Sequence, residues 1–256
     1  MELPTEMESI LDTHPPRRDA SKHPRSVGGS TSTRQRATQV VYQFLRSSIK
    51  GGILKTGDSL HEDQLINDLN ATRASVREAL QSLANEGLVT RRRGRGTLVS
   101  SRPVLIKVND IVTADGYAIE HDIIADTEMP ATGLIRHRLA TEHDTVRKLE
   151  VLIRARSTPV GVLVVFQVDS DAQPVQTTNM DSIAITFERV YGVPFGSMEC
   201  WLDAATADER TAELLEIEPG SLLVVRDQVL TDSSGRVHEF AFAHYRADQV
   251  SFHSRS

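Results

Sequence analysis

The spacing of the apolar side chains changes at Gly87 from the period of a helix to that of a strand. Before Gly87, apolar residues recur three and four positions apart, in stretches broken first at Gly51-Gly52. That spacing gives each stretch one apolar face when it is helical. After Gly87, the runs Leu88–Thr90 and Thr97–Val99 enclose a glycine-bearing turn, which is typical of a β-hairpin. Short helices followed by a hairpin leave few possible folds.

Polar residues predict the ends of these helices. Ser59 followed by Glu62 is a capping-box pattern for the start of the second helix, and Asn70 suits the left-handed residue at its end. Thr72 can cap a third helix that ends at Gly87. Two helices joined by so short a turn predict a helix-turn-helix, with the hairpin as its wing. The apolar faces of the first and third helices are predicted as Val40, Val41, Phe44, Leu45 and Ile49, and as Val76, Leu80 and Leu83.

The charge of the chain divides along its length. The formal net charge is −6, yet residues 34–100 hold 11 basic and six acidic residues, a net of +5. Residues 101–256 hold 14 basic and 24 acidic residues, a net of −10. We interpret the first region as a module that meets a polyanion and the second as one that stays off it. Chance scatter of surface charge is the alternative.

We predict four segments. Residues 1–33 have few large apolar side chains and cannot offset their ordering entropy, which predicts a disordered tail. Residues 34–100 form the winged helix-turn-helix, residues 101–112 a linker, and residues 113–256 a second domain. We expect a cytoplasmic protein, because no apolar run is long enough to span a membrane and the start shows no signal-peptide pattern. The single cysteine, Cys200, excludes an internal disulfide.

The second domain mixes strand-like and helix-like stretches. Antiparallel strands with a few helices between them predict an α+β fold rather than a parallel, doubly wound sheet. Thr206, with Glu209 three residues later, is predicted to cap the last helix, and Asp232–Gly235 is predicted to be a hairpin turn. The expected strands are Arg147–Ile153, Val160–Val168, Gly196–Ala204, Leu222–Leu230 and His238–Tyr245. The expected helices are Gly133–Leu139, Ile183–Val190 and Thr206–Leu215.

The third helix and the wing carry the side chains suited to DNA. A recognition helix enters the major groove by its N-terminal end, where Arg73 can donate two hydrogen bonds to guanine and Thr72 and Ser75 can bond phosphate or base edges. Arg77, one turn later, suits a phosphate. Arginine also fits a narrow minor groove. Wing residues available for such contacts are Arg91, Arg92, Arg93 and Arg95, with Gly94 and Gly96 allowing close approach.

The run from Val40 to Val99 resembles the DNA-binding domain of GntR-type bacterial transcription regulators. The matching motifs are Gly57–Leu60, Thr72–Leu80, Leu83–Val89 and Arg93–Val99. Many relatives have an arginine after the acidic residue that opens the second helix, but here Asp63 follows Glu62, which implies a changed backbone contact. Together with the wing arginines, the resemblance predicts the DNA-binding residues Glu62, Thr72, Arg73, Ser75, Arg77, Arg93, Gly94 and Arg95.

The C-terminal region resembles the UTRA effector domain of the HutC-like branch, whose fold is shared with chorismate lyase. The resemblance runs from Leu149 to Arg246 and implies a small-molecule pocket, a homodimer, and DNA affinity that changes when an effector binds. Position by position, it implies an effector-binding set of Val151, Ile153, Leu163, Ser182, Glu239 and Tyr245.

The implied pocket differs from that of relatives that sense phosphosugars. Those relatives place an Arg-x-Arg pair where this chain has Val151 and Ile153, and an acidic residue at Leu163. Without guanidinium groups the pocket cannot hold a phosphate by paired hydrogen bonds, so a sugar phosphate is not expected. We expect a less charged ligand, either amphipathic or with an amine for Glu239. Plain core packing of the apolar positions is one alternative. Recruitment of Arg154 or Arg156 through a shifted register is another.

The leading interpretation is a dimeric, sequence-specific DNA-binding regulator, more often a repressor in this family, released from its operator by a ligand. No cofactor, catalytic residue or metal site is expected; His238, Glu239 and His244 share one strand but alternate between its faces. One alternative is an enzyme of the lyase-like fold, which turnover by residues 101–256 would reveal. The other is a sequence-indifferent DNA-binding protein, which equal affinity for all sequences would reveal.

Overall fold

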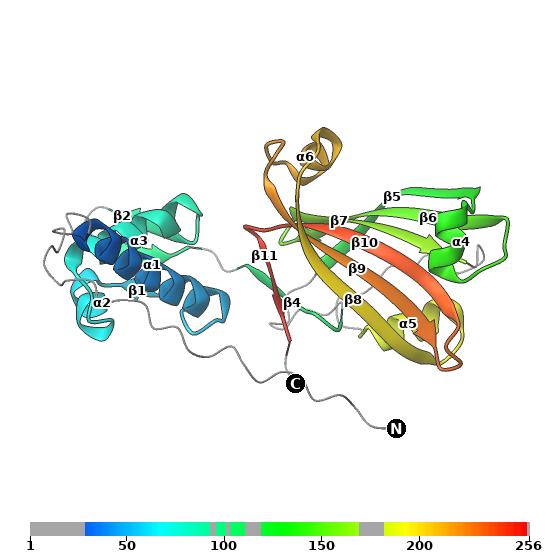
Figure 1. The fold of residues 1–256 in the computed structure, drawn as a ribbon, viewed down its shortest axis with the longest axis horizontal. Helices are drawn as coiled ribbons and strands as arrows, with labels where there is room; N and C mark the ends of the chain where they lie inside the picture. The colour runs from blue at the N-terminus through cyan, green and yellow to red at the C-terminus, as the bar shows by residue number, and fades with distance from the viewer. Residues whose placement is uncertain (1–28, 93–95, 101–102, 111–118, 169–181, 255–256) are drawn as a thin grey trace, which may run out of the picture.

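The computed structural model describes residues 29–92, 96–100, 103–110, 119–168 and 182–254 of the chain, with side chains from residue 34 onward. These residues form a helical N-terminal domain and a sheet-based C-terminal domain (Figure 1). Each domain has its own clusters of buried apolar side chains. Most of the predicted tail lies outside the described residues. No helix among the described ranges combines the length and apolar character needed to cross a membrane.

The N-terminal domain is a winged helix-turn-helix. Its elements are α1 (Gly29–Lys50), β1 (Ser59–Leu60), α2 (Glu62–Asp68), α3 (Arg73–Asn85), β2 (Val89–Arg92) and β3 (Gly96–Val99). The three strands form one antiparallel sheet in the order β1-β3-β2. The inner face predicted for α3 is confirmed, because Val76, Leu80 and Leu83 are fully buried against α1. Asn70 and Gly87 have the positive φ angles expected where α2 and α3 end.

Three local features of this domain differ from the sequence prediction. Ser59 does not cap α2: it lies in β1, and the N-cap is His61, which makes no side-chain cap hydrogen bond. Ser59 adopts a short strand and not a helix cap because Ser59 and Leu60 pair with Leu98 and Thr97 of the wing. The first helix begins at Gly29, earlier than its apolar pattern indicates, because extending a formed helix costs little. Its apolar face is narrower than predicted, since Val40 and Phe44 are exposed.

The C-terminal domain is built on one six-stranded antiparallel sheet in the order β5-β6-β7-β10-β9-β8. Its strands are β5 (Ile119–Pro130), β6 (Thr145–Ala155), β7 (Thr158–Gln167), β8 (Phe195–Thr206), β9 (Leu222–Asp232) and β10 (Val237–Arg246). Its helices are α4 (Gly133–Leu139), α5 (Ile183–Tyr191) and α6 (Glu209–Leu215). Five strands and α4 and α5 lie where the sequence predicted them, and the fold is α+β. The turn at Asp232 is also confirmed: its carboxylate accepts hydrogen bonds from the backbone N–H of Ser234 and Arg236.

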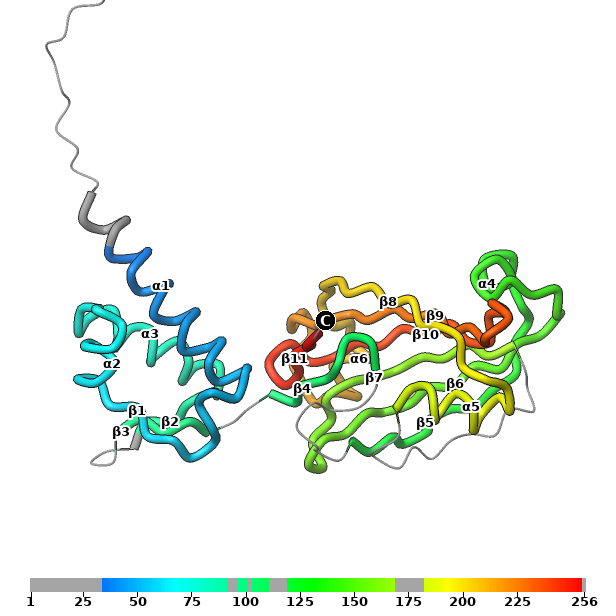
Figure 2. Tube along the Cα trace, turned by 90° about the horizontal axis from the view of Figure 1, so that it is seen from below, coloured from blue at the N-terminus to red at the C-terminus, as the bar shows by residue number. Residues whose placement is uncertain are grey.

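Three strands of the C-terminal domain were not predicted. Strand β5 is an edge strand whose largely exposed, charged sequence carries little period-2 apolar signal. Strand β4 (Val104–Lys107) lies inside the expected linker, where it pairs in parallel with β11 (Val250–His253). Figure 2 shows this pair side by side, where the chain enters the C-terminal domain. A further correction concerns α6, which is capped by Asp208 through the Thr211 N–H, because Thr206 is the last residue of β8.

The strand pair β4-β11 packs on the sheet through its own apolar cluster. Val104 and Ile106 of β4 are buried with Ile153 of β6 and Tyr245 of β10. The Tyr245 ring lies on Gly161, where an added Cβ would come within 2.7 Å of the Tyr245 Cδ1 atom. The segment that leaves the N-terminal domain is therefore held in the core of the C-terminal domain before the large sheet begins.

Candidate nucleic-acid interface and ligand cavity

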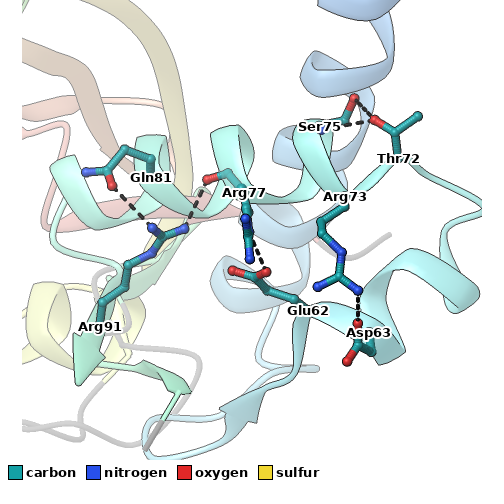
Figure 3. Close-up of polar contacts among 8 residues, drawn as sticks. All are labelled: Glu62, Asp63, Thr72, Arg73, Ser75, Arg77, Gln81 and Arg91. Carbon is teal, nitrogen blue, oxygen red and sulfur yellow. Dashed lines mark hydrogen bonds and ion pairs between the residues drawn. The ribbon is translucent and has the colours of Figure 1, made fainter. Parts of the chain in front are cut away.

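The first turn of α3 is fixed by a side-chain cap. Thr72 Oγ1 accepts a hydrogen bond from the Ser75 backbone N–H at 3.1 Å, and the two hydroxyl groups lie 3.0 Å apart (Figure 3). Thr72 is exposed, whereas Ser75 is fully buried. The cap leaves the N-terminal end of α3 open to solvent, where its partial positive charge can face a phosphate. Because Ser75 is buried, it contributes to the helix cap and not to the exposed surface of α3.

Arg73 and Arg77 project from α3 toward the start of α2 (Figure 3). Arg73 Nη2 donates to Asp63 Oδ1 at 2.6 Å, and Arg77 Nε donates to Glu62 Oε2 at 2.7 Å. More than half of each arginine side chain is exposed. Exposed ion pairs contribute only about 0.2–1 kcal/mol. Both guanidinium groups can therefore exchange a carboxylate for a phosphate or a base at small cost.

The wing is tied to the same helix by Arg91. Its guanidinium donates to the backbone carbonyl of Arg77 at 3.0 Å and to Gln81 Oε1 at 3.5 Å (Figure 3). The structure thus brings Glu62, Arg73 and Arg77 together between α2 and α3, whereas Thr72 lies at the N-cap on the other side of α3 (Figure 3). The remaining predicted DNA-binding residues, Arg93, Gly94 and Arg95, lie outside the described residues.

A cavity of about 120 Å³ lies between α5 and one face of the six-stranded sheet. The face is defined by alternate residues of β6, β7 and β9, since side chains two apart point to the same side of a strand. Helix α5 closes it, with Ser182 accepting from the Ile185 N–H as N-cap. The lining residues are His121, Ile123, Leu149, Val151, Leu163, Val165, Gln167, Ile183, Thr186, Phe187, Val190, Tyr191, Gln228, Leu230 and Glu239.

The polar lining residues meet around Glu239. The Tyr191 hydroxyl donates to Glu239 Oε2 at 2.8 Å, and Gln228 Nε2 donates to Glu239 Oε1 at 3.2 Å. Gln167, directly opposite Glu239 in the β7-β10 register, donates through Nε2 to the Tyr191 oxygen at 2.9 Å. Burial raises the pKa of the Glu239 carboxyl, while the hydrogen bonds from Tyr191, Gln228 and Gln167 oppose that rise.

Two further polar atoms at this site have no hydrogen-bond partner. They are Gln167 Oε1 and Thr186 Oγ1, on side chains that are at least nine-tenths buried. His121, at the β5 side of the cavity, has its pKa lowered to about 4 by burial, so its ring is neutral at pH 7. The cavity therefore has an apolar wall and one polar end rich in acceptors.

The residues predicted to bind an effector fall into three groups. Val151, Leu163 and Glu239 line the cavity. Ser182 caps α5 above it, without lining it. Ile153 and Tyr245 pack in the cluster around β4 and β11 instead.

The sequence left open that a shifted strand register brings Arg154 into the pocket, and the structure does not support this. The Arg154 Nε atom pairs with Asp122 Oδ2 at 3.0 Å, and the residue does not line the cavity.

Sequence reasoning missed Gln167, Thr186, Tyr191, Gln228 and His121. Each is an ordinary residue in its own segment, and only the strand register and the docking of α5 bring them to Glu239. One usable signal was present: Gln167 and Gln228 are polar residues at inward-facing positions of strands that are otherwise apolar on that side.

A winged helix-turn-helix with exposed arginines, joined to a sheet domain that encloses a cavity, defines the class of ligand-responsive DNA-binding regulators. Residues 37–99 match the family described as bacterial regulatory proteins, gntR family, and residues 114–251, over half of the chain, match the UTRA domain. The chain belongs to the GntR family of transcription regulators and carries a UTRA effector domain. It is a DNA-binding transcription regulator whose activity is modulated by an effector.

Relatives of similar length support this assignment. The HTH-type transcriptional repressor NagR of Bacillus subtilis is 24% identical over 238 residues, covering 86% of this chain and 95% of NagR. The regulator Rv0792c of Mycobacterium tuberculosis is 24% identical over 252 residues, covering 91% of this chain and 89% of Rv0792c. The crystal structure of PhnF from Mycobacterium smegmatis has the same fold, with a TM-score of 0.57 at 21% identity, covering 84% of this chain and 98% of PhnF.

Proposed function

We propose that this protein is a homodimeric repressor that binds a pseudo-palindromic operator through two copies of α3 and leaves it when a small molecule fills the cavity. One observation carries the proposal: the same chain has a DNA-binding element and a separate domain with a cavity. The DNA-binding element is the capped helix α3, whose two exposed arginines form ion pairs that DNA can replace. The cavity lies in the C-terminal domain. A helix-turn-helix dimer reads two half-sites about 10 base pairs apart. Because its target is chromosomal DNA, we place the protein in the cytoplasm.

The charge distribution supports this division of labour. The region around the helix-turn-helix carries the net positive charge and the C-terminal region the net negative charge. A polyanion is therefore attracted to one domain and repelled by the other, which orients the protein on DNA. Repression is favoured by the relative NagR, whose name gives it that role.

The dimer is proposed through the C-terminal domain. Support comes from the two edges of the large sheet, where β5 and β8 are each 12 residues long and mostly exposed. Edge strands of this length offer backbone groups to a second chain. Trp201 and Leu202 of β8 add partly exposed apolar side chains to that edge.

Selection of genomic DNA fragments by the purified protein, followed by fluorescence anisotropy across a range of salt concentrations, tests the proposal. We expect a short inverted repeat bound at least about 10³-fold more tightly than bulk DNA. Arg73→Ala is expected to weaken binding of that repeat roughly 5- to 150-fold, the effect of losing about 1–3 kcal/mol of base discrimination. The charge-matched control is Arg210→Ala, an arginine of the C-terminal domain that pairs with Glu150. Equal losses for both variants, on every DNA sequence, would contradict sequence-specific recognition.

The effector signal is proposed to reach the DNA-binding domain through β4. Leu163 lines the cavity and also packs against the cluster that holds Val104 and Ile106 of β4. Ile106→Ala removes part of this apolar contact and leaves the residues that line the cavity unchanged. We expect the variant to keep its ligand affinity while the ligand-induced change in operator affinity falls several-fold, within the roughly 0.5–2 kcal/mol range of such coupling changes. An unchanged ligand response would exclude this route.

A further inference from the structure

The cavity holds an acidic side chain whose hydrogen-bond partners are all neutral. Glu239 is half-buried and accepts from the Tyr191 hydroxyl and the Gln228 amide. A buried carboxylate is costly unless a cation meets it. Among the described residues that line the cavity, His121 is the one basic residue. Its lowered pKa leaves it uncharged at neutral pH.

Two segments outside the described residues adjoin β5, β7 and α5 in the sequence. Residues 111–118 and 169–181 contain no lysine, arginine or histidine in their sequence.

Arg147 of β6 lies opposite Gln167 in the strand register, on the same face of the sheet as Glu239. Its guanidinium donates to both carboxylate oxygens of Asp126, at 2.8 and 2.6 Å. Because Arg147 is paired with Asp126 and His121 is neutral, the described residues around the cavity provide no unshared positive charge for Glu239. A metal ion fits poorly, since Glu239 is the single carboxylate among the lining residues and no group of three or more metal-ligating side chains exists among the described residues.

The unpartnered atoms define what the incoming group must offer. Gln167 Oε1 is an acceptor without a donor, and Thr186 Oγ1 is a hydroxyl without any partner. Buried polar atoms are almost always hydrogen-bonded, so two orphans lining one cavity point to a ligand that supplies hydrogen-bond donors. An ammonium group has three donors and no acceptor, which matches an end that presents Glu239 and Gln167 Oε1.

The rest of the cavity sets the size and character of the ligand. Its walls are mostly aliphatic, with Phe187 from α5 and Leu149, Val151 and Leu163 from the sheet. Its volume of about 120 Å³ is close to the roughly 150 Å³ of an apolar protein cavity that holds benzene. A ligand with one small ring or a short alkyl chain fills such a space.

From these observations we infer that the effector is a small amphipathic amine, with its ammonium group on Glu239 and its apolar body between α5 and the sheet. The inference rests on the proposed function, in which this cavity takes the effector, and it adds the chemical class. A phosphorylated ligand is disfavoured because the polar end of the cavity presents acceptors to it.

Isothermal titration calorimetry of the full chain with benzylamine, benzyl alcohol and benzoate tests the class, because the three share a ring and differ in the charge of the end group. We expect benzylamine to bind roughly tenfold or more tightly than benzyl alcohol, as a charge-assisted hydrogen bond provides, and benzoate to bind most weakly. In Glu239→Gln the preference for the amine is expected to vanish. In Glu199→Gln, an exposed glutamate of β8, it is expected to stay. Equal affinities for the amine and the alcohol, or no binding of benzylamine, would overturn the inference.

Two further readouts do not depend on the folding of Glu239→Gln. Benzylamine affinity of the unmodified protein is expected to fall as acid protonates Glu239, while benzyl alcohol affinity stays level. Thr186→Val removes an unpartnered hydroxyl, so we expect it to raise the melting temperature and weaken benzylamine several-fold. If Thr186→Val binds benzylamine with unchanged affinity, the Thr186 hydroxyl does not contact the ligand.

The outcome for the amine is separable from the outcome for the regulator. Release of the selected operator by another compound, with no binding of benzylamine, overturns the amine class and leaves the proposed function standing. Binding of benzylamine by a protein that selects no DNA sequence overturns the proposed function and leaves the amine class standing.

Discussion

The two domains hold their functional charges in opposite ways. On the N-terminal domain, Arg73 and Arg77 form ion pairs with Asp63 and Glu62 that are open to solvent and easily exchanged. In the C-terminal domain, Glu239 is half-buried and accepts hydrogen bonds from neutral donors. Exposed charges suit a large polyanion that approaches from outside and is screened by salt. A buried charge suits a small partner that must lose its water, so selectivity there comes from complementary groups.

The largest expected effect tests whether the two domains are independent. Leu83 is fully buried in the cluster of the N-terminal domain, so Leu83→Ala is expected to cost about 2–5 kcal/mol of that domain's unfolding free energy. The single tryptophan, Trp201, lies in the C-terminal domain. Urea unfolding is therefore expected to shift when followed by helical circular dichroism and to stay unchanged when followed by tryptophan fluorescence. Equal shifts by both probes would mean that the domains unfold as one unit.

The next largest effect concerns acid and the C-terminal domain. The pKa of His121 is lowered from 6.5 to about 4 by burial. As the pH falls, the unfolded chain takes up this proton first, so stability is full above about pH 7, declines between pH 6.5 and 4, and levels off below. At 1.36 kcal/mol per pKa unit, the decline approaches about 3 kcal/mol. In His121→Gln this part of the pH dependence is expected to disappear from urea midpoints followed by Trp201 fluorescence. An identical pH profile for both proteins would contradict the assignment.

The comparison also explains what the sequence could predict. Thr72, Asn70 and Gly87 act within a few residues of themselves, so the helix-turn-helix and its boundaries follow from local pattern. One error arose where a distant strand competes for a local signal. Ser59 has the capping pattern but pairs with Leu98 of the wing.

The cavity could be predicted only in part. Val151, Leu163 and Glu239 were found through resemblance, since their positions follow the order of strands. Tyr191 and Gln167 lie 24 residues apart and reach Glu239 only after α5 docks on the sheet and β7 pairs with β10. Such non-local polar contacts leave no periodic trace in the sequence.

A smaller effect is expected at the cap of the recognition helix. Thr72→Ala removes the acceptor of the Ser75 N–H, which costs about 1 kcal/mol of stability. Because Arg73 follows the cap directly, we expect operator affinity to fall several-fold as well, more than affinity for a scrambled duplex. Thr72→Ser keeps the hydroxyl and is the matched control in thermal unfolding and anisotropy. Loss of operator binding by the serine variant to the same extent would point to the threonine methyl group rather than to the cap.

The smallest expected effect has the opposite sign. Asp63→Asn removes the carboxylate that holds Arg73 in the free protein at 2.6 Å, and it removes a negative charge beside the DNA. An exposed pair of this kind is worth about 0.2–1 kcal/mol, so operator affinity is expected to rise up to about fivefold at low salt and by less at high salt. Anisotropy with operator and scrambled duplexes measures both gains.

The matched control is Asp68→Asn, at the other end of the same short helix. If Asp63 acts by competing for Arg73, the gain is confined to the operator and is absent when Asp63→Asn is combined with Arg73→Ala, because the two effects are then not additive. If it acts only by repelling phosphates, the gain appears on every duplex and survives without Arg73. A loss of operator affinity in Asp63→Asn would mean that the carboxylate orients Arg73 for base contact. The exposed ion pair would then take part in DNA recognition, and would not be a contact that DNA displaces.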